Sequence, residues 1–483
     1  MKKIIISKLF LYKHRFLIGY ILLGLAFVGL LFGLPFIAQK GLSTVEMESV
    51  VSSYELEPDA AFNGDLINLP YRLLQKVSIS ILGLTPFAIK LPSIIIGLLL
   101  GLLLILILNR WFKNNVSLLA SILITLSTPF LFLAGSGTPL IMIVFWPVLL
   151  LWLGSKIQGE NHPEPIFCFA FAIALLLSIF TPYMIYFAVL CIVFVLTQPH
   201  LRFVIKNLPK IPLIIIGVFV LAGIAALIIN IIKSPSIAME LLFSRDFHIS
   251  NFFNNLSSGF ALVFSWNNSL ESVFLSPLIS LPIFAIGLIG LFSTTKGFFA
   301  SRNSIATLLI VFTIIITGFN PDAIVFIIFP FSILVAHGLK YILEKWYGLF
   351  PENPYARIFA ILPLTILLSI MILPGLLQYI YGYRYNPSVA NQFTNNLSII
   401  RENLTDESLL VAADTTEGKF YRILEDSTNL KVITEVTPET TGNIASFGKI
   451  QNIPAGRKLS RIITSEKSDN SDIIYLYTVV EGE

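Results

Sequence analysis

The sequence predicts an all-α membrane protein with about eleven transmembrane helices and a small α/β domain at its carboxy-terminal end. Hydrophobic residues make up 55% of the 483 residues, charged residues only 12%, and the mean hydropathy is +0.83. Soluble domains have roughly 45 to 50% apolar residues. The apolar runs also have helical length, because a helix needs about 20 apolar residues to cross a bilayer. Basic residues gather in alternate loops, which is typical of a multi-pass protein.

The expected spans follow one another along most of the chain. The first, 16–37, follows five basic residues but lacks a small-residue cleavage site, so we interpret it as a retained anchor rather than a signal peptide. The later runs lie near 87–108, 116–134, 139–153, 165–180, 182–196, 211–232, 277–292, 305–318, 324–339 and 358–377.

The distribution of lysine and arginine predicts the topology. With the amino terminus in the cytoplasm, most basic loop residues lie inside. These are Arg110, Lys113, Lys156, Arg202, Lys206, Lys210, Lys296, Arg302, Lys340, Lys345 and Arg357. An odd number of spans then places the carboxy-terminal region outside. We therefore expect a transmembrane domain at 1–378, with outer loops at 39–86 and 233–275, and an extracytoplasmic α/β domain at 379–483. In that domain, strands are expected at 409–412, 430–434 and 473–480, and a helix around 389–404.

The first outer loop holds the residues whose chemistry is most informative. Glu46 and Glu48 lie shortly after the first span, where a carboxylate can serve as general base or metal ligand. A solvated acidic loop would show the same residues. Arg72, Lys76 and Lys90 are candidates for binding an anionic phosphate, although basic side chains also snorkel to lipid head groups.

The second outer loop places Arg245 and His248 beside an aromatic, asparagine-rich stretch at 252–268. Such a stretch is typical of an aromatic belt at the membrane interface. Alternatively, its aromatic rings form a surface on which a sugar stacks.

Several classes of function are disfavoured by the sequence. It has no phosphate-binding loop, no H-E-x-x-H motif and no cluster of His and Cys, so ATP-driven transport and zinc protease activity lose support. Cys168 and Cys191 both lie in apolar runs, which argues against a structural disulfide. The basic residues set membrane orientation, so no nucleic-acid partner is expected. No cofactor is specified, and a divalent cation stays open.

Three stretches resemble the GT-C superfamily of polytopic membrane glycosyltransferases, which includes protein O-mannosyltransferases and aminoarabinose transferases. These are Asn68-Leu69-Pro70-Tyr71, the segment 82–93 that ends in Lys90-Leu91-Pro92-Ser93, and the turn from Gly135 to Trp146. The stretch 320–339, which starts Asn320-Pro321-Asp322, is similar to the late helices of that superfamily. The resemblance covers most of the membrane part but not the outer domain.

The resemblance implies a polyprenyl-phosphate sugar as donor and a single displacement that inverts the anomeric carbon. It also implies an acidic residue of the first outer loop that activates the acceptor, here Glu46 or Glu48. Arg72, Lys76 or Lys90 would neutralise the departing phosphate. We expect substrate contacts from Asn68, Tyr71, Arg245 and His248.

The chain departs from the superfamily pattern at two places. The usual Asp-Glu pair is replaced by Glu46-Met47-Glu48, and an acidic residue common after the proline of the turn is Leu140. The second change is consistent with lost metal binding, another substrate or a degenerate enzyme.

These observations lead to one main hypothesis and two alternatives. The main hypothesis is a plasma-membrane glycosyltransferase that acts on an envelope acceptor (lipid, glycan or protein) at the extracytoplasmic face, with membrane lipids and the donor as partners. A transporter or flippase of a lipid-linked intermediate is one alternative. A catalytically degenerate GT-C scaffold is the other.

Overall fold

The computed structural model describes most of the chain. The described residues are 14–39, 41–56, 66–158, 165–198, 202–203, 210–243, 248–265, 274–294, 301–349, 354–404, 408–412, 415–425, 430–436, 442–450, 457–464 and 473–479. Arg245 therefore lies outside the described residues.

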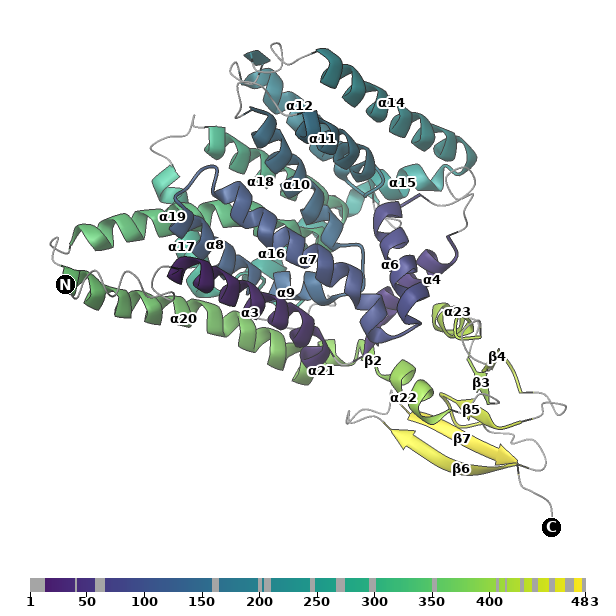
Figure 1. Ribbon diagram of the computed structural model, residues 1–483. Coiled ribbons are helices and arrows are strands. Elements are labelled where there is room, and N and C mark those ends of the chain that lie inside the picture. The colour runs from purple at the N-terminus through teal and green to yellow at the C-terminus, as the bar shows by residue number, and fades with distance from the viewer. Residues whose placement is uncertain are drawn as a thin grey trace.

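Helices dominate the described residues up to Tyr385 (Figure 1). The α-helices of this part are α3 (Arg15–Ala38), α4 (Thr44–Tyr54), α6 (Leu69–Leu82), α7 (Pro86–Leu108), α8 (Asn114–Thr125), α9 (Thr128–Gly135), α10 (Ile141–Gln158), α11 (Pro165–Ser178), α12 (Met184–Thr197), α14 (Lys210–Lys233), α15 (Ser236–Leu242), α16 (Phe252–Phe264), α17 (Leu281–Thr294), α18 (Ser301–Phe319), α19 (Ile328–Gly348) and α20 (Pro354–Tyr385). Two 3-10 helices, η1 (Ile249–Asn251) and η3 (Pro321–Ile327), precede α16 and α19.

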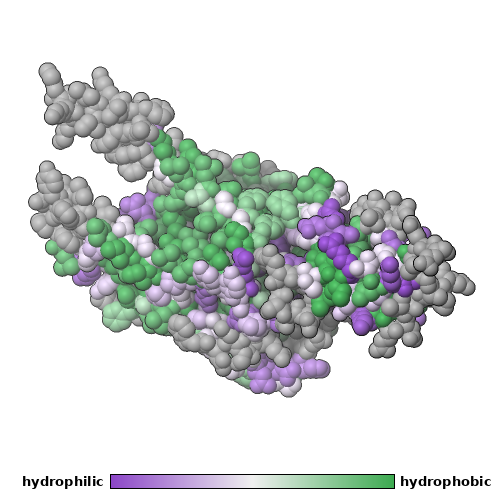
Figure 2. All heavy atoms as spheres, turned by 90° about the horizontal axis from the view of Figure 1, so that it is seen from below, coloured by the Kyte–Doolittle hydropathy of each residue, from purple (hydrophilic) through white to green (hydrophobic). Residues whose placement is uncertain are grey.

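The membrane character expected from the sequence is confirmed by helix length and composition. Five segments are long and apolar enough to cross a membrane: 21–38, 86–108, 214–233, 321–348 and 362–385. The bent pair α8 and α9 passes the same test as a unit, and five shorter apolar helices accompany them. Each expected span coincides with one of these elements. Figure 2 shows the resulting hydrophobic surface over the helical part, with hydrophilic residues towards its lower edge and the right-hand end.

The expected straight span at 116–134 is instead broken by a bend of 68° between α8 and α9. Pro129 lies in the first turn of α9, where its missing N–H and fixed φ suit a helix start but prevent α8 from continuing. The Thr128 hydroxyl donates to the Gly375 carbonyl at 2.9 Å, which ties the break to α20.

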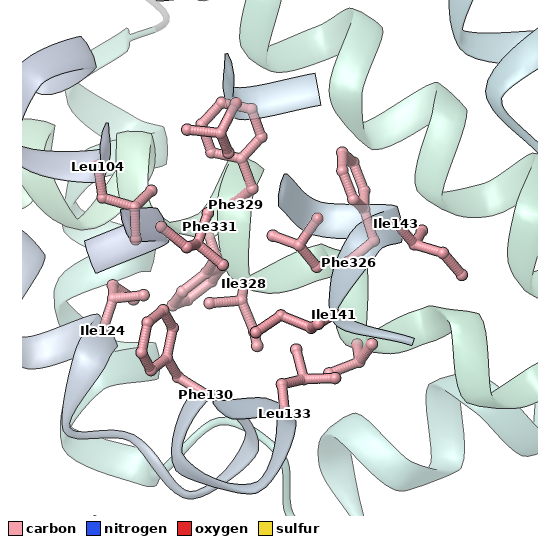
Figure 3. Packing of buried hydrophobic residues seen from close by; sticks show 14 of the residues in the cluster. Leu104, Ile124, Phe130, Leu133, Ile141, Ile143, Phe326, Ile328, Phe329 and Phe331 are labelled. Atoms are coloured by element: carbon pink, nitrogen blue, oxygen red, sulfur yellow. The ribbon is translucent and has the colours of Figure 1, made fainter. Parts of the chain in front are cut away.

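The core of the bundle forms where η3 and α19 meet helices from the first half of the chain. Phe326 and Phe329 are fully buried there and pack with side chains of α7 to α10 (Figure 3). The segment from η3 to the middle of α19 is therefore surrounded by protein rather than lipid.

The region after α20 is a small α/β unit. Its five-stranded sheet has the order β4-β3-β5-β7-β6, formed by Lys431–Ile433, Leu409–Val411, Ile444–Ser446, Ile473–Val479 and Arg457–Thr464. Strand β3 pairs in parallel with β4 and β5, whereas β7 pairs antiparallel with β5 and β6. The three expected strands are present. The expected helix at 389–404 is divided into α21 (Pro387–Ala390), strand β2 (Phe393–Thr394) and α22 (Asn396–Asn403).

The α/β unit is joined to the segment that follows α3. Strand β1 (Leu42–Ser43) pairs antiparallel with β2, so the residues after α3 lie beside those after α20 (Figure 1). Gly41 permits this approach because its φ is +96° and an added Cβ would collide with the Thr394 carbonyl. Helix α23 (Thr416–Arg422) packs on α4, and both contribute to one hydrophobic cluster. Helix α4 and the α/β unit thus share a core.

Candidate functional site

A cavity of about 670 Å³ lies between α4, the bundle and the α/β unit. Its walls come from α4, the start of α6, the turn after α9, the residues before α12, α15, η3, β2 and α23. Its charged lining residues are Glu46, Glu48, Glu55, Arg72, Glu240, Asp322 and Lys419. Aromatic side chains also line it, namely Phe132, Tyr183, Phe243, Phe274 and Phe393.

Helix α4 carries the two predicted carboxylates, and its start is fixed by a capping box. The Ser43 hydroxyl accepts from the Glu46 N–H at 3.3 Å, and the Glu46 carboxylate accepts from the Ser43 N–H at 2.8 Å. This reciprocal pair satisfies backbone donors that an uncapped helix would leave open. Because Ser43 also belongs to β1, the cap fixes α4 to the strand pair.

The other oxygen of Glu46 faces Lys90 and the turn after α9. Its Oε1 accepts from the Gly137 N–H at 2.7 Å and lies 3.7 Å from the Lys90 Nζ. Both side chains are only 1% exposed. Two buried charges at this distance compensate each other, whereas either alone would pay a large desolvation cost. Glu46 thus connects α4, α7 and the turn.

Gln75 is a second fully buried connector behind α4. Its Oε1 accepts from the hydroxyls of Ser49 and Ser53 at 2.9 and 2.7 Å. Its Nε2 donates to the carbonyls of Ile89 and Gly137 at 3.3 and 3.0 Å. The amide of one glutamine therefore fixes α4, α6, α7 and the turn relative to one another.

Tyr71 lies in the same layer and does not line the cavity. Its hydroxyl shares a 2.8 Å hydrogen bond with the Ser93 hydroxyl, which donates to the Thr138 carbonyl at 3.4 Å. Burial raises the pKa of the Tyr71 phenol above its usual range, so the group stays protonated. Tyr71 is therefore part of the buried core of the bundle.

Glu48 differs from Glu46 in its surroundings. Both residues line the cavity, but Glu48 is exposed whereas Glu46 is buried. Arg72 lines the cavity as well, and its guanidinium donates to the Ser52 carbonyl, with Nε at 3.0 Å. These bonds hold Arg72 against α4, so the structure brings a carboxylate and a guanidinium to the same cavity.

The remaining predicted residues lie in various places. Asn68 lines the cavity and has a left-handed backbone with φ of 55°. Lys76 donates to the carbonyls of Tyr54 and Leu56 and does not line the cavity. Lys90 lines a separate, smaller cavity of about 210 Å³. His248 is exposed away from the main cavity.

Several cavity residues were not predicted from the sequence. Asn320 and Asp322 begin η3, where the Asn320 side chain accepts from the Asp322 N–H at 2.9 Å. The sequence of this stretch indicates its similarity to the late helices of the GT-C superfamily, but it does not by itself predict that Asn320 and Asp322 line a cavity. Glu240 lies on α15, and nothing in the local sequence connects it with Glu48. Leu140 also lines the cavity. Among the described residues, no group of three or more His, Cys, Asp or Glu could hold a metal ion.

Comparison with known proteins agrees with this architecture. Residues 70–229 match the sequence model of the dolichyl-phosphate-mannose-protein mannosyltransferase family. No curated protein matches the sequence.

Solved structures are also similar to the chain in fold, including those of ArnT and AglB. ArnT from Cupriavidus metallidurans, solved with undecaprenyl phosphate, is 12% identical and has a TM-score of 0.54, over 95% of this chain and 98% of that one. The archaeal oligosaccharyltransferase AglB from Archaeoglobus fulgidus, solved with an inhibitory peptide and a dolichol-phosphate, is 12% identical with a TM-score of 0.50. That match covers 91% of this chain and 70% of AglB. The chain therefore has the fold of the GT-C superfamily of membrane glycosyltransferases.

Proposed function

We propose that the protein transfers a sugar from a polyprenyl-phosphate donor to a hydroxyl of a cell-envelope acceptor, which is a lipid, a glycan or a protein. The observation that carries this proposal is the cavity beside the helical bundle, which is lined by both Glu48 and Arg72. ArnT was solved with undecaprenyl phosphate and AglB with a dolichol-phosphate, which supports a donor of this class.

The environment of the cavity suits a substrate that arrives from the membrane. Helix α6 begins at the wall of the cavity. It exposes Leu73, Val77 and Ile81 on one side. Its opposite side buries Arg72 and Gln75. A helix with one apolar exposed face and one polar buried face is suited to lie along a membrane surface. A lipid-linked donor could then place its phosphate near Arg72 while its chain stays in the bilayer.

Glu48 is the better candidate for the general base. Both oxygens of Glu46 accept N–H hydrogen bonds, and one also pairs with Lys90. These contacts commit both oxygens of Glu46 to holding α4, the turn and Lys90 together. Glu48 forms no ion pair within the described residues and is open to the cavity. We assign Glu46 the role of holding the turn and α4 in place.

The proposed reaction is a single displacement. Glu48 takes the proton of the acceptor hydroxyl as the acceptor oxygen forms a bond to the anomeric carbon. The bond between that carbon and the phosphate oxygen breaks, and polyprenyl phosphate leaves with the electron pair. A cation at the phosphate stabilises the charge that develops there, a role for which Arg72 is suited.

We also propose the orientation of the protein. Basic loop residues place the amino terminus in the cytoplasm, and the α/β unit with the cavity would then face outward. A plasma membrane with the acceptor on its outer side fits this arrangement. The Glu46–Lys90 pair lies near the start of α7, whereas a transporter would favour charge pairs at the bilayer midplane.

A second candidate is a GT-C scaffold that binds polyprenyl phosphate without transferring sugar. It is favoured by Leu140, an apolar residue in the cavity at a position that is often acidic in the superfamily. The contacts of Glu46 with Ser43, Gly137 and Lys90 favour the scaffold too, because they give this carboxylate a structural role instead of a catalytic one.

The experiment that separates the two candidates is sugar transfer by the purified protein in lipid vesicles. Radiolabelled polyprenyl-phosphate sugars would be offered with envelope extracts as acceptors, and protein-free vesicles would serve as control. Label moved to the acceptor fraction supports the transferase. Well-folded protein that binds the lipid phosphate but transfers none of several sugars would identify the scaffold.

A further inference from the structure

The cavity holds fewer of the predicted phosphate-binding cations than expected. Arg72 lines it, but the Lys76 ammonium is directed to backbone carbonyls and Lys90 is buried against Glu46. The lining also includes five carboxylates, whose negative charges disfavour an anionic ligand. They belong to Glu46, Glu48, Glu55, Glu240 and Asp322. Arg72 alone would face these carboxylates, so a second cation at the cavity would matter for binding any anion.

That second cation comes from the α/β unit. Lys419 lies on α23 and lines the cavity together with Thr416 of the same helix. The side chain is exposed, and it forms no ion pair with another described residue. Its ammonium is therefore available to a ligand in the cavity.

The position of Lys419 is fixed by its neighbours on the same helix. Phe420 and Tyr421 are fully buried, and their cluster includes Met47 and Val50 of α4. The pairing of β1 with β2 holds the α/β unit at a second point. The Arg401 guanidinium adds a third by donating to the Leu84 carbonyl at 3.0 Å. Helix α23 is thus anchored to the helix that carries Glu48.

We propose that Lys419 and Arg72 together bind the anionic oxygens of a substrate, so that the α/β unit completes the site. This inference rests on the proposed function for the identity of the ligand. The shared chemistry is a phosphate or similar anion, either the phosphate of the lipid donor or an anionic group on the acceptor. Two cations on separate helices contact one anion from two directions through charge-assisted hydrogen bonds.

The test uses the full chain in lipid nanodiscs. Its first part, the donor arm, measures binding of the lipid phosphate and therefore requires no sugar transfer. The dissociation constant of polyprenyl phosphate is measured for wild type, Lys419→Gln, Lys419→Arg and Lys431→Gln, with neutral polyprenol as a reference ligand. Lys431 is an exposed lysine of the same unit that does not line the cavity, so it is the matched control. Thermal unfolding of each variant verifies that it is folded.

If Lys419 contacts the donor phosphate, Lys419→Gln weakens binding of polyprenyl phosphate by roughly three- to tenfold, as expected for one charged hydrogen bond at an exposed site. Binding of polyprenol, and binding by Lys419→Arg and Lys431→Gln, stay close to wild type.

An acceptor arm distinguishes the source of the anion. If Lys419 contacts the acceptor, Lys419→Gln raises the acceptor KM by a similar factor and leaves lipid-phosphate binding unchanged. The inference would be overturned if Lys419→Gln had the wild-type dissociation constant for polyprenyl phosphate and, where transfer is measurable, the wild-type acceptor KM. It would also be overturned if Lys431→Gln weakened binding as much as Lys419→Gln. Absence of transfer in wild type would count against the proposed function, while the donor arm would still test Lys419.

Discussion

Replacing Glu46 with glutamine removes one charge of the buried pair and keeps the shape of the side chain. The one carbonyl oxygen of glutamine can accept from either the Ser43 N–H or the Gly137 N–H, but its amide NH2 group can accept from neither, so one of these two bonds is lost. The charge opposite Lys90, whose side chain is only 1% exposed, is lost as well. Removing one member of a buried ion pair costs about 3 to 5 kcal/mol, because the remaining charge stays buried without compensation.

A double-mutant cycle measures this coupling. The free energy of unfolding would be determined by denaturant titration in detergent for wild type, Glu46→Gln, Lys90→Met and the double variant. Because the double variant has no buried charge at this place, we expect it to recover most of the loss, with a coupling above about 1.5 kcal/mol. A loss below about 1 kcal/mol for Glu46→Gln, or additive losses in the double variant, would refute the structural role of this pair.

Three further substitutions test how the cavity is held. Gln75→Leu should lower the free energy of unfolding by about 1 to 3 kcal/mol, because buried polar groups lose their partner. Gly41→Ala should expose α4 to limited proteolysis, since an added Cβ collides with the Thr394 carbonyl and φ is +96°. Thr128→Val should destabilise by about 1 kcal/mol through loss of the bond to the Gly375 carbonyl. Wild-type stability or protease resistance in any of these variants would contradict its contact.

The membrane fold was predictable because lipid imposes one dominant requirement on sequence. A helix that spans the bilayer must be apolar over its whole length, so α3, α7 and α14 are each visible as one long run. The break between α8 and α9 was not predicted. Both sides of the break are apolar, and its cause includes a tertiary contact with α20 that local composition does not reveal.

The α/β unit was predicted less completely for a different reason. Strand β7 is long and hydrophobic, so its pattern was visible, whereas β6 (Arg457–Thr464) has mostly exposed residues and basic side chains. Edge strands with charged residues have little hydrophobic alternation to detect. Strand β5 lies at the centre of the sheet and all three of its residues are buried, so it shows no alternation of exposed and buried side chains.

The candidate site was only partly predictable. Glu48, Arg72 and Asn68 were named, and all three line the cavity. Local reasoning could not distinguish Glu46 from Glu48, because their separation depends on which side of α4 faces Lys90 and the turn. Lys419 lies more than three hundred residues from Arg72 in sequence, and only the docking of α23 on α4 brings it to the same cavity.

The most direct test of the account measures lipid binding and sugar transfer on the same samples of wild type and Glu48→Gln. Removal of a general base costs roughly 10² to 10⁴-fold in rate, whereas an exposed Glu-to-Gln change should leave stability within about 0.5 kcal/mol. We therefore predict that Glu48→Gln binds polyprenyl phosphate like wild type and loses transfer by at least about a hundredfold. Transfer at the wild-type rate by Glu48→Gln, with Glu46→Gln inactive although folded, would contradict the assignment of the base.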